Sequence, residues 1–182
     1  MKKYKVGLYI GRFQPYHLGH HSIIKKMAQE CEVVIVAVGS AQESGTEHNP
    51  FSYEMRRSMI QYSIDRIVED YRIVGVPDRE NPAEDPSWTK YLLQYVYDST
   101  GLMPQAIYQG DDQVREHWYD GVNIKVEIVP RNKIPISASL LRKVILADDY
   151  WFFTQFVTYA VDRRYDEMRE ILREINGGSY YE

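Results

Sequence analysis

The feature that most constrains the fold is a near-continuous apolar run at Glu32–Val38, with the sequence Glu-Val-Val-Ile-Val-Ala-Val. β-Branched residues favour strands, and a strand that is apolar on both faces belongs in a parallel sheet covered on both sides. Further strand-like runs alternate with segments of helical spacing along the chain. This alternation predicts right-handed crossovers and a doubly wound parallel sheet of the α/β class.

The expected elements follow this alternation over the whole chain. Strands are expected at residues 5–10, 32–38, 71–76, 105–108 and 123–129. Helices are expected at residues 20–30, 53–67, 87–100, 114–119, 137–147, 149–160 and 162–176. A chain of 182 residues can bury a core without disulfides. We expect one domain over residues 1–182, with a core over about 1–147 and a helical extension over 148–182.

The first expected strand is followed by a loop with one arginine and two histidines three residues apart: Gly11-Arg12-Phe13-Gln14-Pro15-Tyr16-His17-Leu18-Gly19-His20. The loop leads into a helix whose first turn offers N–H groups and a partial positive charge. The imidazoles and Arg12 add donors where charge builds up in phosphoryl or nucleotidyl transfer. We interpret this ordered set as a phosphate-handling site.

Unusual residues also follow the other expected strands: Gly39-Ser40-Ala41-Gln42, residues 78–88, Gly110-Asp111-Asp112 and residues 131–139. In a doubly wound sheet the carboxyl ends of the strands share one edge, where ligands bind near the switch point. Small residues such as Gly39 and Ser40 let a ligand approach the backbone closely. This convergence predicts a ligand site independently of any motif.

Two expected helix starts carry further polar residues. Ser137 and Ser139 begin one helix, and Arg142 follows within its first turn, where it can bond to a polyphosphate. Ser52 can cap the helix that carries Arg56, which lies near the ligand edge. Taken alone, each set also fits a capped helix with a solvated arginine.

Composition limits the partners. The chain has 22 Lys and Arg against 26 Asp and Glu, a net charge of −4, and therefore lacks the basic field that nucleic-acid binding demands. Arg12 interrupts the first apolar run too early for a signal peptide or a membrane span. The single cysteine, Cys31, is expected to be buried near the end of the first helix. We expect a cytoplasmic protein with neither nucleic-acid nor membrane partners.

Four segments together resemble the archaeal-type nicotinamide mononucleotide (NMN) adenylyltransferases of the nucleotidyltransferase superfamily. They are Gly11 to His20, Gly39-Ser40-Ala41-Gln42-Glu43-Ser44, Asn49-Pro50-Phe51-Ser52 with Arg56, and Ser137-x-Ser139-x-x-Arg142. The resemblance runs from residue 5 to about residue 147. It implies a Rossmann-like nucleotidyltransferase fold with extra C-terminal helices. It also implies adenylyl transfer from ATP to NMN, which gives NAD and pyrophosphate with Mg²⁺ as the cofactor.

The resemblance implies that the NMN 5′-phosphate attacks the ATP α-phosphate in line. The catalytic residues would be His17, His20, Arg12 and Arg142. ATP contacts would come from Gly11, Phe13, Gly19, Gly110, Asp111, Ser137 and Ser139. NMN contacts would come from Gly39 and Ser40, from Arg56 at the phosphate and from Trp88 against the ring. The metal would be held mainly by the ATP phosphates, with no protein ligand, and family members often form homo-oligomers.

Other interpretations stay open. The scaffold also serves other adenylyl- and cytidylyltransferases, such as the enzyme acting on pantetheine phosphate. A sensor that binds NAD without turnover would keep the pocket but could lose His17, His20 or Arg142. Asp85 stands where the family often carries an amide, and a carboxylate there would repel nicotinate mononucleotide. NMN is therefore the expected acceptor.

Overall fold

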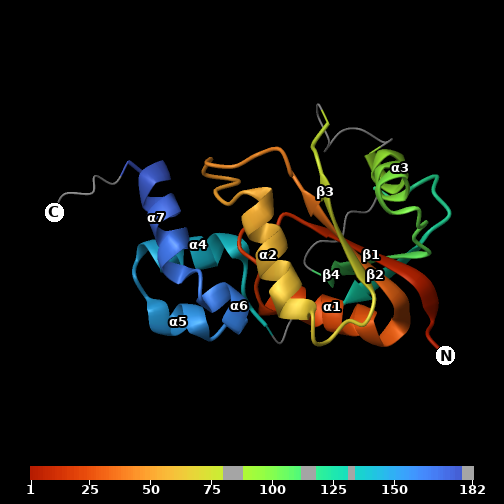
Figure 1. Cartoon of the computed structure of the whole chain (residues 1–182), viewed down its shortest axis with the longest axis horizontal. Coiled ribbons are helices and arrows are strands. Elements are labelled where there is room, and N and C mark those ends of the chain that lie inside the picture. The colour runs from red at the N-terminus through yellow and green to blue at the C-terminus, as the bar shows by residue number, and fades with distance from the viewer. Residues whose placement is uncertain (80–87, 112–117, 131–133, 178–182) are drawn as a thin grey trace.

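A five-stranded parallel sheet forms the centre of the molecule (Figure 1). The computed structural model describes residues 1–79, 88–111, 118–130 and 134–177. The strands are β1 (Tyr4–Gly11), β2 (Cys31–Gly39), β3 (Tyr71–Val76), β4 (Ala106–Gly110) and β5 (Lys125–Val129). Their spatial order is β3-β2-β1-β4-β5, so the order reverses between β1 and β4. The expected doubly wound sheet is confirmed.

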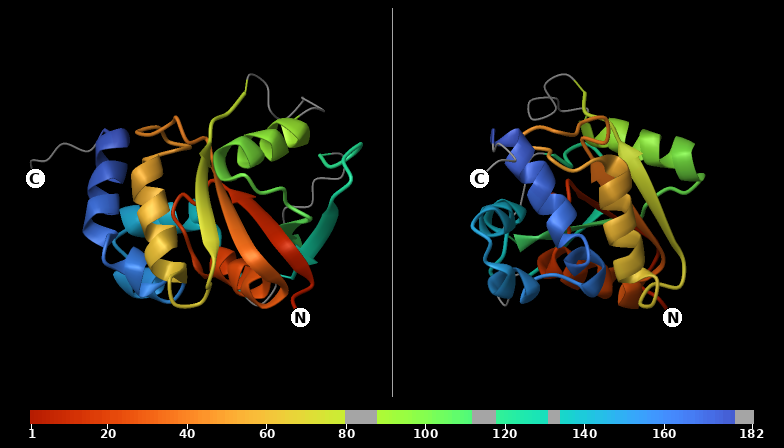
Figure 2. Two further views of the ribbon diagram at one scale, coloured as in Figure 1. Left: turned by 45° about the vertical axis from the view of Figure 1, so that its right-hand side comes forward. Right: turned by 60° about the vertical axis from the view of Figure 1, so that its left-hand side comes forward.

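Helices cover both faces of the sheet (Figures 1 and 2). They are α1 (Leu18–Glu30), α2 (Tyr53–Ile64), α3 (Trp88–Thr100), α4 (Ala138–Leu146), α5 (Tyr150–Thr154), α6 (Tyr159–Asp162) and α7 (Tyr165–Ile175). One face packs against α3. The other packs against α1 and α2, and α4 to α7 extend this layer.

The alternation of side chains along the strands explains the two cores. Leu8 of β1 lies opposite Ile35 and Ile107 in the register, and all three face α3. The next residue along each strand points to the opposite face, towards α1 and α2: Tyr9, Val36 and Tyr108. The sheet is therefore buried on both sides, as the apolar run in β2 predicts. Cys31 is buried as expected, at the start of β2.

The C-terminal region corrects one expectation. The single helix predicted over residues 149–160 is wrong, because the chain forms α5 and then α6 with a break at residues 155–158. In the break, the Phe156 carbonyl accepts from the Leu18 N–H of α1 at 2.8 Å. The Thr158 hydroxyl lies 2.6 Å from that of Ser63 on α2. Tertiary bonds to two other helices therefore outweigh the helical spacing.

Other boundaries shift slightly or fall outside the described residues. The helix predicted over 53–67 ends at Ile64, and the strand predicted over 123–129 begins at Lys125. Most of the short helix predicted over 114–119 lies outside the described residues, and Trp118 and Tyr119 form a turn. Asp85 also lies outside them. Within the described ranges, no helix is both long and apolar enough to cross a membrane.

Candidate active site

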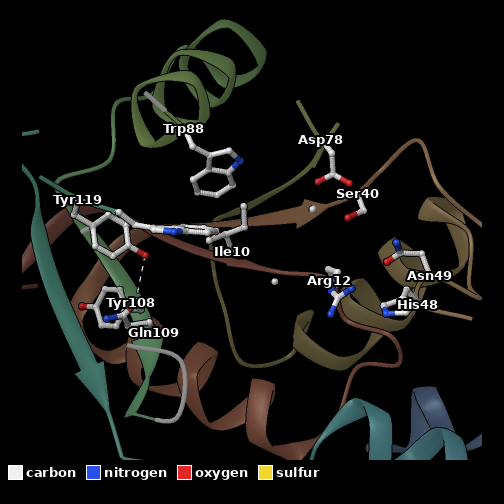
Figure 3. Close-up of a pocket in the computed structure, with 13 residues that line it drawn as sticks. Ile10, Arg12, Ser40, His48, Asn49, Asp78, Trp88, Tyr108, Gln109 and Tyr119 are labelled. Carbon is white, nitrogen blue, oxygen red and sulfur yellow. Dashed lines mark hydrogen bonds between the residues drawn. The ribbon is translucent and has the colours of Figure 1, made fainter. Parts of the chain in front are cut away.

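A cavity of about 480 Å³ opens at the carboxyl ends of the strands (Figure 3). Its walls include the ends of β1, β2 and β4, beside the point where the strand order reverses. Figure 3 shows two unlike ends. Trp88, Tyr108 and Tyr119 lie at one end, and Arg12, His48, Asn49, Ser40 and Asp78 lie at the other. A ring and an anionic group of a single ligand could each find a matching surface here.

The two histidines of the motif are held by local bonds at the start of α1. His17 is the N-cap residue, and its Nδ1 accepts from the Gly19 N–H at 3.1 Å. The His17 N–H donates to Nδ1 of His20 at 3.3 Å, which completes a capping box made of imidazoles. The rings stack with centroids 3.6 Å apart. Because each Nδ1 accepts, the neutral rings carry their protons on Nε2, which becomes the donor atom.

The side chain of Phe13 packs against the histidine pair. Its side chain is 1% exposed and packs edge-on against His20, with centroids 4.8 Å apart. Its φ of 54° lies in the left-handed region. A Cβ at Gly11 would lie 3.0 Å from the Phe13 ring, a tight contact that the glycine avoids. The predicted nucleotide residue Phe13 thus lies in the core, outside the cavity lining.

Arg142 joins α4 to the motif loop. Its Nη1 donates to the Gln14 carbonyl at 2.8 Å, and its Nη2 donates to the Ser139 hydroxyl at 3.4 Å. The hydroxyl of Ser137 caps α4 by accepting from the Leu140 N–H at 3.1 Å. Ser137 and Ser139 are exposed at this helix start, so the three predicted residues lie together beside the histidine loop.

The guanidinium groups of Arg56 and Arg142 both lie near that of Arg12. Burial, and then the nearby charge of Arg12, lowers the pKa of Arg142. Burial also lowers the pKa of Arg56 to about 10, and Arg12 adds to this effect while Asp78 and Glu54 oppose it. This local positive charge occurs in a chain of net charge −4. An anion bound beside Arg12 would relieve the repulsion, so this edge is suited to phosphates.

Arg56 differs from its predicted position. Its side chain is completely buried and does not line the cavity. Its guanidinium donates to the carbonyls of Arg12, Gly39 and Ser40 at 2.9, 2.8 and 3.0 Å. It lies beneath the strand ends, where a ligand phosphate would have to displace these bonds to reach it. The expectation of direct contact with the NMN phosphate is therefore corrected: the side chain is occupied by the backbone.

Trp88 lies in the cavity wall, at the first turn of α3. A second tryptophan accompanies it, since the Trp88 and Trp118 ring centroids are 4.3 Å apart. The Thr89 hydroxyl donates to the Trp118 carbonyl and holds the two segments together. Sequence reasoning missed Trp118, although this aromatic residue follows the polar Gly110-Asp111 group on the same sheet edge.

The remaining predicted residues divide between the two parts of this edge. Gly11, Arg12, Gly39 and Ser40 line the cavity, and Ser40 adopts a left-handed φ of 49°. Gly19 is buried in the first turn of α1, Gly110 ends β4, and Asp111 follows it. Sequence reasoning also missed His48 and Tyr119 as lining residues, whereas Asp78 begins the group at residues 78–88 that was expected at the ligand edge. Basic His48 directly precedes the Asn-Pro-Phe motif, which is a signal that could have identified it.

No group of three or more His, Cys, Asp or Glu residues that could hold a metal ion occurs among the residues with described positions.

Comparisons with known proteins agree with this geometry. A family model described as cytidylyltransferase-like matches residues 8–168. The nicotinamide-nucleotide adenylyltransferase of Saccharolobus solfataricus is 32% identical over 146 residues, which cover 80% of this chain and 81% of the relative. The enzyme of the same name from Methanosarcina barkeri is 40% identical over 138 residues, covering 69% and 78%.

A solved structure shares the fold. It is the bifunctional NMN adenylyltransferase/ADP ribose pyrophosphatase of Francisella tularensis, complexed with AMP and a Mn ion. It matches with a TM-score of 0.69 and 20% identity, over 96% of this chain and 52% of that one, so this chain spans about half of its length. The family match and the curated relatives show that the chain belongs to the cytidylyltransferase-like nucleotidyltransferases and, among them, to the nicotinamide-nucleotide adenylyltransferase family.

Proposed function

We propose that the protein is an enzyme that transfers the adenylyl group of ATP to NMN and releases NAD and pyrophosphate. The relatives from Saccharolobus solfataricus and Methanosarcina barkeri carry the name of this activity. The observation that carries the proposal is the two-ended cavity, which is aromatic at Trp88 and cationic at Arg12. A mononucleotide has the same polarity, with a flat ring at one end and a phosphate at the other.

The reaction needs no covalent enzyme intermediate. An oxygen of the NMN 5′-phosphate forms a bond to the α-phosphorus of ATP, while the bond from that phosphorus to the bridging oxygen of the β-phosphate breaks. Pyrophosphate leaves with the electron pair. The attacking phosphate is already anionic, so catalysis consists of positioning and of stabilising charge.

We assign the charge stabilisation to the residues at and around the loop from Gly11 to His20, which we call the histidine side of the sheet edge. His17 and His20 would donate from Nε2 to the ATP phosphates, with Arg12 beside them. Ser137, Ser139 and Arg142 would hold the β- and γ-phosphates. These assignments are supported by the shared sheet edge and by the bond that joins Arg142 to the motif loop. The backbone of Phe13 belongs to this loop, while its side chain supports His20.

The remaining site residues are assigned to the nucleoside parts of ATP and NMN. Gly11, Gly19, Gly110 and Asp111 are proposed to lie along ATP, near β1 and β4. Gly39, Ser40 and Trp88 are proposed to receive NMN, and their place in the cavity wall supports this assignment.

We propose Mg²⁺ as the metal, bound mainly through the triphosphate oxygens. The described residues offer no metal-binding cluster of three acidic, His or Cys side chains, so the arginines and histidines are suited to the phosphates themselves. When bound, the ion neutralises negative charge on the transferring and leaving groups. The Mn ion in the Francisella tularensis complex is consistent with a divalent metal in this fold.

The domain, assembly and compartment are proposals as well. We propose one catalytic domain over residues 1–182, with a core over about 1–147 and a helical extension over 148–182. Among its described residues the extension exposes three large aromatic side chains, Tyr150, Trp151 at 73% and Tyr159 at 72%, which supports a homo-oligomer. Cys31 is a free, buried thiol whose Sγ donates to the Tyr108 hydroxyl, which is consistent with a reducing cytoplasm.

The decisive experiment is a parallel assay of three acceptors with ATP and Mg²⁺: NMN, nicotinate mononucleotide and pantetheine phosphate. We expect pyrophosphate release with NMN and formation of NAD. Turnover of pantetheine phosphate with none of NMN would assign the protein to another branch of the superfamily. NAD binding without turnover of any mononucleotide would indicate a sensor.

A further inference from the structure

Arg56 is a fully buried cation whose bonds all end on the backbone. Its Nη1 and Nη2 reach the carbonyls of Arg12, Gly39 and Ser40, and its Nε donates to the Ser52 carbonyl at 3.2 Å. No carboxylate pairs with it among the described residues. Buried arginines are usually paired with an acid, so this arrangement is unusual for a purely structural role.

The side chain keeps its charge under working conditions. Burial lowers the pKa of Arg56 to about 10, which still leaves the guanidinium protonated near neutral pH. Four carbonyl dipoles replace the solvation that burial removes. The positive charge is therefore fixed directly behind the strand ends, and it is not cancelled by a bonded carboxylate.

The bonded carbonyls belong to residues of the cavity wall. Arg12, Gly39 and Ser40 all line the cavity, whereas Arg56 does not. Carbonyl oxygens carry partial negative charge and would repel a phosphate. These three oxygens accept hydrogen bonds from the buried guanidinium, which lies behind the cavity wall. Ser40 also adopts a left-handed φ of 49°, a conformation that needs support in a residue other than glycine.

Arg56 also connects two segments that must stay in register. Its Nη1 bonds to the loop after β1 and to the end of β2, and its own helix α2 supplies the anchor through Ser52. A planar guanidinium fixes several acceptors at once, which a lysine ammonium on a flexible stem does less well. One side chain thereby ties Arg12 to Gly39 and Ser40, just beyond the last paired residues of the β1–β2 ladder.

We propose that Arg56 is a positioning residue, which shapes the acceptor site by holding the ends of β1 and β2 and turning their carbonyls away from the bound mononucleotide. This inference rests on the proposed function, because it places the acceptor phosphate at the ends of β1 and β2, next to the ATP phosphate that it attacks and that Arg12 also faces. In this proposal Arg56 does not contact the NMN phosphate directly but acts on the acceptor site through the backbone carbonyls that it holds.

The test compares the variants Arg56→Lys and Arg56→Met with the control variant Arg57→Lys. Arg57 follows Arg56 on the same helix and is exposed. Thermal unfolding first establishes a temperature at which each variant is folded. At that temperature, Arg56→Lys is expected to raise KM for NMN at least about tenfold and to change KM for ATP less than about threefold. Arg56→Met is expected to bind NMN more weakly still, so the conservative variant gives partial rescue. Arg57→Lys should match the wild type.

A second readout separates binding from turnover. Quenching of tryptophan fluorescence by NMN without ATP is expected to weaken in Arg56→Lys by the same factor as KM. Unchanged KM and quenching in folded Arg56→Lys, with only a lower melting temperature, would overturn the positioning role. Equal rises in KM for both substrates would also overturn it. Failure of the wild type to form NAD in this assay would instead contradict the proposed function.

Discussion

The two parts of the candidate site are built in different ways. On the histidine side, His17 and His20 bond within one helical turn, and their geometry comes from a capping box that spans four residues. On the aromatic side, Trp88 and Trp118 come from separate segments that meet only through the fold. The orientation of the two imidazoles is set by bonds between near neighbours in the chain. A site assembled from distant segments depends on every contact that holds them.

The largest expected effect tests the histidine side. His20→Ala is expected to lower kcat at least about a hundredfold, the scale of losing one transition-state donor. His20→Gln, whose amide N–H reaches the Nε2 position, should retain more activity than His20→Asn, whose oxygen replaces only the Nδ1 acceptor of the cap. Steady-state kinetics with both substrates measure these effects. An unchanged kcat in His20→Ala would contradict its catalytic role.

The next effect tests the aromatic side. Trp88→Ala is expected to raise KM for NMN about tenfold or more, because stacking on a ring contributes about 1–3 kcal/mol. The value of kcat should change less than KM. Tyr62→Ala, which truncates an aromatic residue 70% exposed on α2, is the matched control. A selective rise in KM for ATP would show that Trp88 contacts ATP and would contradict its assignment to NMN.

A stability effect separates a third histidine from the first two. Nδ1 of His21 lies 3.0 Å from the Tyr16 hydroxyl, and burial, with the charge of Lys25, lowers the pKa of His21 to about 4. An unfolded histidine titrates near pH ~6.5, so between these values only the unfolded state takes up the proton. Stability that is present above pH ~6.5 is therefore lost as the pH falls towards about 4.

We expect this histidine to reduce the free energy of unfolding by about 1–2 kcal/mol between about pH 7 and pH 4.5, since its partial exposure moderates the shift. Urea unfolding at several pH values measures the effect. His21→Gln removes the titrating group and should lose less stability over the same range. Identical pH profiles for the two proteins would show that His21 does not cause the loss.

The smallest effect tests the contact between the C-terminal helices and the core. Thr158→Val removes the bond to Ser63 and is expected to cost about 1 kcal/mol of unfolding free energy, with kcat unchanged. Thr154→Val is the control, because the Thr154 hydroxyl donates within its own turn, to the Trp151 carbonyl. A fall in kcat in folded Thr158→Val would show that the extension also supports the histidine loop, through the bond from Leu18 to Phe156.

Much of the fold is predictable because its signals are local. β3 has the predicted bounds, and the strand predicted at residues 32–38 lies within β2. Periodicity alone places α1 and α4 near their observed ends. It fails at residues 155–158, where the spacing is helical but bonds to α1 and α2 favour a break. A tertiary contact of this kind leaves no periodic signal in the sequence.

The sequence by itself determined the parallel sheet, the shared ligand edge and the histidine loop, because apolar alternation and helix capping act between near neighbours. Only the tertiary structure decided that Arg56 lies beneath the strand ends and that Trp118 packs beside Trp88 in the cavity wall. The physical reason is the range of the interactions. An arginine near a ligand edge can face the cavity or the backbone, and which acceptors it meets depends on segments brought together by folding.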